Sequence, residues 1–138
     1  KNRLRVRVAG ILERNGKILL LNIHSPILNT MIWIPPGGGV QFGESLHGAL
    51  KREFFEETNL KVEPETLCHV NELIEGEYHA IEFFFRVNEA GGEMKMGHDP
   101  EISSTDQIIK EIGFFGREEL KEMAVAPQYL KKDYWQES

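Results

Sequence analysis

The chain has 138 residues, of which 41% are hydrophobic and 28% are charged, and its formal net charge is −6 at pH 7. This length predicts a single domain, residues 1–138, and no apolar run reaches the roughly 20 residues that a membrane-spanning helix requires. The acidic balance disfavours long nucleic acid as the main partner, because such binders normally present a basic face, but it allows small phosphorylated molecules.

The sequence disfavours secretion, a disulfide and a zinc site. No charged leader followed by an apolar stretch and a small-residue cleavage site is visible, so we expect a cytoplasmic protein without a membrane partner. The single cysteine, Cys68, excludes an internal disulfide and is expected to fill the core of a strand. Zinc is not expected, because the histidines lack paired ligand spacing. They are His24, His47, His69, His79 and His98.

The first predicted elements are two strands joined by a hairpin. Basic and apolar residues alternate over residues 3–12, as they do in a half-buried strand. Asn15-Gly16 is the strongest short signal for a hairpin turn, and the chain returns through a strand at residues 18–22.

A short strand, a glycine-rich turn and a helix follow. Residues 32–34 are expected to form a buried strand, which Pro35-Pro36 stop. The glycines at 37–39 free the backbone to turn and to approach a ligand closely. A helix is predicted over residues 44–58, because apolar residues recur there at helical spacing.

The second half of the chain completes a sheet. Strands are predicted at residues 67–73 and 78–87. Residues 89–106 are polar, lack periodicity and exceed the usual loop length, which makes them a candidate functional loop. No internal repeat or linker is present, so we expect the α+β fold class, with a mixed sheet in an α/β/α sandwich. The last predicted elements are a strand at 108–115, a helix from residue 116 and an amphipathic tail at 128–135.

Three carboxylates on the predicted helix carry most of the chemistry. Glu53, Glu56 and Glu57 lie at helical spacing and share one side, where like charges repel unless a cation lies between them. An all-oxygen ligand set favours Mg²⁺ or Mn²⁺. The alternative is a solvated face in which Arg52 and Glu56 form an ordinary surface pair. Because Glu53 and Glu57 flank the apolar stripe, we expect them at the rim of a cleft instead.

The spacing of this segment resembles the Nudix box, G-x5-E-x7-R-E-U-x-E-E-x-G-U, in which U is a bulky apolar residue. One position departs from it: Asn59 replaces the last glycine, and asparagine is the commonest substitute for glycine in a left-handed backbone. The matching residues are Gly38, Glu44, Arg52, Glu53, Phe54, Glu56, Glu57 and Leu60.

The resemblance implies a fold, a reaction and a set of roles. It implies the Nudix sandwich and the hydrolysis of a phosphoanhydride bond in a nucleoside diphosphate linked to another group, with Mg²⁺ or Mn²⁺ as cofactor. By resemblance, Arg52 orients Glu53 or Glu56, and Glu44 braces the cluster. The implied metal ligands are Glu53, Glu56, Glu57 and the carbonyl of Gly37.

The general base differs among members of this family, some of which use a glutamate of the box and others a carboxylate of a later loop. Here the loop offers Asp99, Glu101 and Asp106. Glu101 ranks first, because Pro100 stiffens the segment before it.

The substrate is less well defined by the sequence. Tyr78 lies 18 residues after Leu60, about where dinucleoside-polyphosphate hydrolases of the family carry a tyrosine, although a strand tyrosine commonly packs at an edge. Arg5, Arg7 and His24 are candidates for contacting outer phosphates or a sugar, against the alternative of a solvated strand face. We find no signature of the ADP-ribose or coenzyme A subgroups.

Two functions therefore stay open. One is an enzyme that acts on a nucleoside triphosphate, a nucleotide sugar or a dinucleoside polyphosphate. The other is a Nudix-like domain that binds a nucleotide as a sensor or scaffold without cutting it. The complete set of Arg52, Glu53, Glu56 and Glu57 favours the enzyme, because a binding module has no need of a like-charged metal cluster. The sequence leaves a homodimer open as a further partner.

Overall fold

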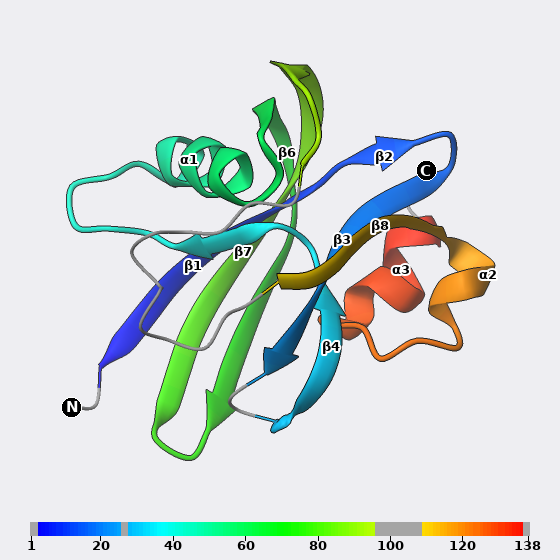
Figure 1. Ribbon diagram of the computed structural model, residues 1–138. Coiled ribbons are helices and arrows are strands. Elements are labelled where there is room, and N and C mark those ends of the chain that lie inside the picture. The colour runs from blue at the N-terminus through cyan, green and yellow to red at the C-terminus, as the bar shows by residue number, and fades with distance from the viewer. Residues whose placement is uncertain (1–2, 26–27, 96–108, 137–138) are drawn as a thin grey trace.

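Two sheets form the centre of the molecule (Figure 1). The computed structural model describes residues 3–25, 28–95 and 109–136. The first sheet is mixed, because β1 runs parallel to β7 while its other pairs are antiparallel. The second is antiparallel. The first sheet has the order β5 (Gly37–Gly39), β1 (Leu4–Ile11), β7 (Tyr78–Gly92), β6 (Leu60–Glu75); the second contains β2 (Glu13–Arg14), β3 (Lys17–Ser25), β4 (Thr30–Ile34) and β8 (Ile109–Gly116).

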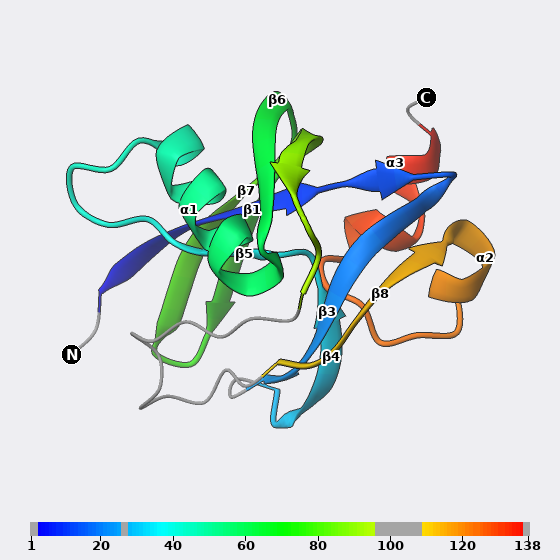
Figure 2. The same cartoon turned by 45° about the horizontal axis from the view of Figure 1, so that its top comes forward.

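Helices cover the sheets from two sides (Figures 1 and 2). The helix α1 (Leu46–Thr58) packs on the first sheet, whereas α2 (Arg117–Leu120), the 3-10 helix η2 (Gln128–Lys131) and α3 (Asp133–Gln136) gather at the other side. This arrangement confirms the predicted α/β/α sandwich with a mixed sheet. None of the helices in the described ranges has the length and apolar composition needed to cross a membrane.

Each helical layer has its own hydrophobic core. Under α1, Leu50 and Phe54 are fully buried and pack with Val8 and Leu60. On the other side, residues of the two sheets pack with those of the short C-terminal helices. Half-buried Cys68 contacts this second cluster from β6, as expected for a core-filling residue. The members of the second cluster include Ile11, Ile18, Leu20, Phe84, Leu120, Leu130 and Tyr134.

Local turn signals give the positions of the hairpin and the helix correctly. Asn15 and Gly16 have φ of 54° and 77°, the left-handed backbone that a tight hairpin needs. The helix begins two residues later than predicted, because Ser45 is its N-cap and accepts a hydrogen bond from the Gly48 N–H. Glu44 therefore precedes α1, and its carboxylate contacts Arg52 further along the helix.

Three predicted segments need correction. Residues 37–39 form a strand, not a turn, and none of these glycines has positive φ. The strand predicted at 67–73 belongs to one long strand, β6, whose pairing with β7 is interrupted by irregularities. Because β7 continues to Gly92, the first residues of the predicted loop at 89–106 are paired strand residues. The part of that loop from residue 96 to residue 106 lies outside the described residues.

Candidate active site

An open cleft of about 1080 Å³ lies on the face of the first sheet that carries the odd-numbered residues of β1. Its walls include the glycine strand β5, and Glu53 and Glu57 reach it from α1. Both carboxylates are nearly buried, with exposures of 7% and 5%. The cleft thus brings together the glycines and two of the acids that the sequence singled out.

The glycines are required by close approach of the backbone. A Cβ on Gly37 would lie 2.1 Å from the Val8 carbonyl oxygen, and one on Gly38 would lie 2.3 Å from the Glu53 carboxyl carbon. Any other residue at either position would push β5 away from β1 or displace the Glu53 carboxylate. The atoms that these glycines approach belong to the protein itself, so the predicted close approach to a ligand stays a prediction.

The outer edge of β5 faces the polar side of α1. In an antiparallel pair, opposite residues alternate between exchanging hydrogen bonds and pointing away. Hydrogen bonds from Gly10 N to Pro36 O and from Val40 N to Val6 O flank the paired segments of β1 and β5. The backbone N–H and C=O groups of Gly37 and Gly39 therefore point away from β1. The Gly37 N–H accordingly donates to Glu57 Oε1 at 2.9 Å. Its carbonyl lies on the same outer edge.

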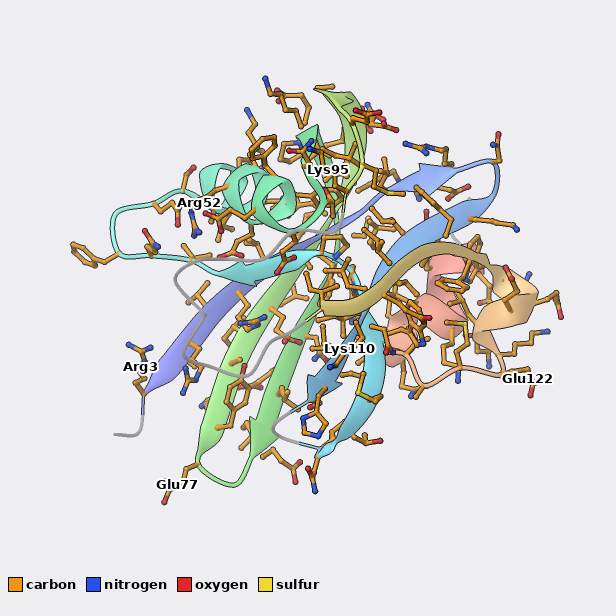
Figure 3. The ribbon with its side chains drawn as sticks, viewed as in Figure 1. Arg3, Arg52, Glu77, Lys95, Lys110 and Glu122 are labelled. Carbon is orange, nitrogen blue, oxygen red and sulfur yellow. The ribbon has the colours of Figure 1, made fainter. Side chains whose placement is uncertain are left out.

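Arg52, labelled in Figure 3, contacts the acidic residues of the site. Its Nε and Nη2 donate to the two carboxylate oxygens of Glu44 at 2.7 and 3.0 Å. Its Nη1 donates to Glu53 Oε2 at 3.0 Å and to Glu56 Oε1 at 3.4 Å, and Nη2 also reaches the Gly39 carbonyl. The guanidinium therefore fixes the two cluster acids to β5 and to the segment before α1. This planar fork is a geometry that lysine does not reproduce.

The same contacts shift the ionisation of the pair. The hydrogen bond from Arg52 holds the pKa of Glu44 below its ordinary value, with the Gln41 backbone N–H adding to the effect. The hydrogen bond to Glu44 in turn raises the pKa of Arg52. Both groups are thus charged over the whole neutral range.

This shift predicts a pH-dependent stability difference. A carboxyl group whose pKa is lowered on folding stabilises the fold above its unfolded value of 4.5, and that stabilisation is lost as the pH falls through the folded value. We expect the gap in the free energy of unfolding between wild type and Glu44→Gln to shrink as the pH is lowered from about 6 to about 3. Urea unfolding at a series of pH values measures this gap, and a gap that does not change would contradict the assignment.

Some of the other predicted site residues line the cleft, and others do not. Arg7 and Tyr78 line the cleft. His24 does not, because Ile23 and Ser25 line it and side chains alternate along a strand, so His24 lies on the opposite face of β3. Glu56 contacts Arg52 without lining the cleft, and Glu101 lies outside the described residues.

Sequence reasoning missed several cleft residues, among them Arg3, Asn71 and Glu82. Arg3 could have been found, because the alternation on β1 places it on the same face as Arg7. Asn71 and Glu82 could not, since their neighbourhood depends on the pairing of β6 with β7. Asn71 Nδ2 donates to Glu82 Oε1 at 2.9 Å, so β6 and β7 contribute a joined polar pair to the cleft.

The donors present are suited to a hard divalent cation. Within the part of the chain that the structure describes, no three His, Cys, Asp or Glu side chains form a ready-made metal site. Two nearly buried carboxylates nevertheless reach the cleft beside the outward-facing Gly37 carbonyl. Mg²⁺ commonly keeps several waters and binds through one or two carboxylates together with substrate phosphates. The donor set fits this mode of binding.

Asn59, the one departure from the box, ends α1 as predicted. Its φ of 66° is left-handed, and its side-chain amide donates to the Glu93 carbonyl at 2.7 Å. The asparagine thus combines the backbone conformation that glycine would supply with a tether to Glu93, the residue that follows β7.

Two substitutions test this position. Asn59→Gly keeps the backbone conformation and loses the tether, so we expect a change of at most about 1 kcal/mol in the free energy of unfolding, with turnover retained. Asn59→Val should cost more, because a β-branched residue is strained at positive φ. Urea unfolding and turnover of both variants check this, and loss of turnover in a folded Asn59→Gly protein would give the amide a direct role.

Known proteins resemble this chain in sequence. The family model described as NUDIX domain matches residues 1–134. A curated relative, the ADP-ribose pyrophosphatase of Methanocaldococcus jannaschii, is 32% identical over 94% of this chain and 72% of its own length.

Solved structures share the fold. A MutT protein from Methanosarcina mazei Go1 superposes with a TM-score of 0.76 at 22% identity, covering 100% of this chain and 99% of its own. A MutT NUDIX hydrolase from Burkholderia pseudomallei gives the same TM-score at 23% identity, covering 94% of this chain and 95% of its own. At these identities, the likeness supports the fold alone.

Proposed function

Because this chain belongs to the Nudix family and is a pyrophosphohydrolase of that family, we propose that it hydrolyses a phosphoanhydride bond in a nucleoside diphosphate linked to another group. The observation that carries the proposal is the carboxylate pair Glu53 and Glu57 at the cleft wall, held by Arg52 and by the Gly37 N–H. The name of the relative, ADP-ribose pyrophosphatase, supports a substrate of this class.

We assign the divalent cation, Mg²⁺ or Mn²⁺, to Glu53, Glu56, Glu57 and the Gly37 carbonyl. When bound, such an ion neutralises phosphate oxygens and activates water. The contribution of the chain is positioning: the Gly37 N–H fixes one oxygen of Glu57, and Arg52 fixes Glu53 and Glu56. Arg52 thereby acts as a positioning residue, and Glu44 holds Arg52 in turn.

The reaction that we propose is attack of water on phosphorus with rupture of the bridging P–O bond. The proton of the attacking water passes to a carboxylate, for which we retain Glu101, with a box glutamate as the alternative. Arg7 is proposed to bind a phosphate in the cleft, and Tyr78 to stack on a base. A cytoplasmic location and a homodimer stay predictions.

A substrate panel tests the proposal. The protein is incubated with Mg²⁺ and ADP-ribose, a nucleotide sugar, nucleoside triphosphates or dinucleoside polyphosphates, and the products are separated by chromatography. We expect cleavage within the phosphate chain, which yields AMP and ribose 5-phosphate from ADP-ribose. Tight binding of these compounds without any cleavage would instead support the alternative function, a nucleotide sensor or scaffold.

Removal of the metal gives a direct prediction. We expect cleavage to stop in excess chelator and to return with added Mg²⁺ or Mn²⁺, because a carboxylate cluster cannot hold a phosphate without a cation between them. Product formation measured before chelation, after chelation and after metal replacement checks this. Full turnover of every effective substrate in chelator would contradict the metal assignment.

A further inference from the structure

Three arginines form a row along the cleft, two of them on β1 and the third, Arg3, directly before that strand. Arg3, Arg5 and Arg7 occupy alternate positions and therefore share one face of the strand, and all three line the cleft. Val8, which follows Arg7, points to the opposite face of β1 and is buried under α1. We call Arg3, Arg5 and Arg7 the arginine row.

The row starts beside the carboxylates and extends away from them. Arg7 lies opposite Gly39 of β5, whose carbonyl accepts from Arg52. Arg5 and Arg3 follow at intervals of about 6.6 Å along the strand, so that the row spans about 13 Å. Figure 3 shows Arg3 near the free end of β1, away from Arg52.

Little negative charge on the described protein balances this row. Arg7 Nε lies 3.8 Å from Glu82 Oε2, at the limit for an ion pair. The Arg5 guanidinium stacks over the Tyr78 ring at 5.0 Å, which orients the group without neutralising it. Within residues 3–25, 28–95 and 109–136, no ion pair joins Arg3 or Arg5 to a carboxylate.

The cleft is therefore divided electrostatically. At one end the carboxylates require a cation, and along β1 the guanidiniums favour an anion. A substrate with only the scissile diphosphate would occupy the first part and place an uncharged sugar against the arginines. A longer phosphate chain would satisfy both parts, since Arg binds phosphate through a charge-assisted fork.

We propose that the arginine row binds phosphates beyond the scissile bond, so that the preferred substrates are dinucleoside polyphosphates with long phosphate chains. This inference rests on the proposed function, of which it names the substrate class. This substrate class differs from that of the Methanocaldococcus jannaschii relative, whose name specifies ADP-ribose.

The preference of the enzyme for substrates with a longer phosphate chain tests the proposal. We measure kcat/KM for diadenosine pentaphosphate and for ADP-ribose at one Mg²⁺ concentration, and take their ratio as the preference. The wild type should prefer the pentaphosphate, and Arg5→Gln or Arg3→Gln should lower the ratio about 10-fold each, as expected for a lost charged hydrogen bond. Arg5→Lys, which retains the charge, should recover part of it.

A control variant and added salt show whether a change in the ratio comes from the arginine row or from a general loss of positive charge. Arg117 is exposed on α2 and does not line the cleft, so Arg117→Gln should leave both rates unchanged. Added salt should lower the wild-type ratio, because screening weakens the outer contacts. An unchanged ratio in both folded arginine-row variants would overturn the proposal.

Failure of the proposed function is distinguishable from failure of this inference. If the wild type cleaves no compound, the proposed function fails. Calorimetric titration with diadenosine pentaphosphate and with ADP-ribose then tests whether the arginine row binds phosphate. Tighter binding of the pentaphosphate, weakened about 10-fold by Arg5→Gln, would support the row as a phosphate site. Equal affinities of the wild type for both compounds would overturn it.

Discussion

The variant Glu57→Gln is expected to lose about 10²-fold in kcat while it stays folded. Glutamine keeps the shape of the side chain and an oxygen that can accept from the Gly37 N–H, the contact of 2.9 Å that ties α1 to β5. It removes the negative charge proposed to bind the cation. The substitution therefore separates the structural contact of Glu57 from its charge, because only the second is lost.

The measurement combines steady-state kinetics at saturating Mg²⁺ with thermal unfolding. Glu118→Gln is the control, because Glu118 is exposed on α2, where it pairs with Lys121 at the surface. We expect the control to match the wild type in rate. Near-normal rates in both Glu57→Gln and Glu56→Gln would place the chemistry elsewhere in the molecule.

The helix and its acids were predictable because their signals are local. The apolar spacing that predicts α1 also fixes which side of it faces the sheet, and Glu53 and Glu57 flank that side. Their positions at the cleft follow from this geometry. The left-handed backbone at Asn59 was predictable for the same reason, since it depends only on the end of the helix.

The composition of the cleft depends on pairing between distant segments. The sequence predicts a strand around Arg7 and ends the next predicted strand at residue 22, before His24. It does not show which face of either strand meets the cleft. That is decided by the parallel pairing of β1 with β7 and by the position of β3 in the second sheet. A shift of one residue in either register would exchange the two faces. This is why Arg7 lines the cleft and His24 does not.

The role of the glycines was predictable only in part. A run of three glycines indicates unusual backbone freedom, and positive φ is the usual reason for it. Here the cause is the packing of β5 between β1 and the Glu53 carboxylate, which leaves no room for a Cβ at Gly37 or Gly38. Such crowding arises from tertiary contacts that the local sequence does not encode.

Replacing Arg52 is expected to affect stability and turnover together. Arg52→Gln removes the charge that meets Glu44, Glu53 and Glu56, so these acids would be left facing one another around a neutral side chain. We expect the free energy of unfolding to fall by about 2–4 kcal/mol, because charged hydrogen bonds each contribute about 1.5–3 kcal/mol. The kcat should fall about 10²-fold, since Glu53 and Glu56 lose their orientation.

Two further variants make this prediction specific. Arg52→Lys keeps the charge but cannot contact Glu44 and Glu53 through one planar fork, so it should recover more stability than kcat. Arg14 also pairs with a carboxylate through two contacts, to Glu89 at 2.8 Å, but at the exposed surface. Arg14→Gln should therefore change the free energy of unfolding by less than about 1 kcal/mol and leave kcat unchanged. If Arg52→Gln resembled Arg14→Gln in both urea unfolding and kcat, Arg52 would be an ordinary surface arginine, and the positioning of the carboxylates would have to come from β5 alone.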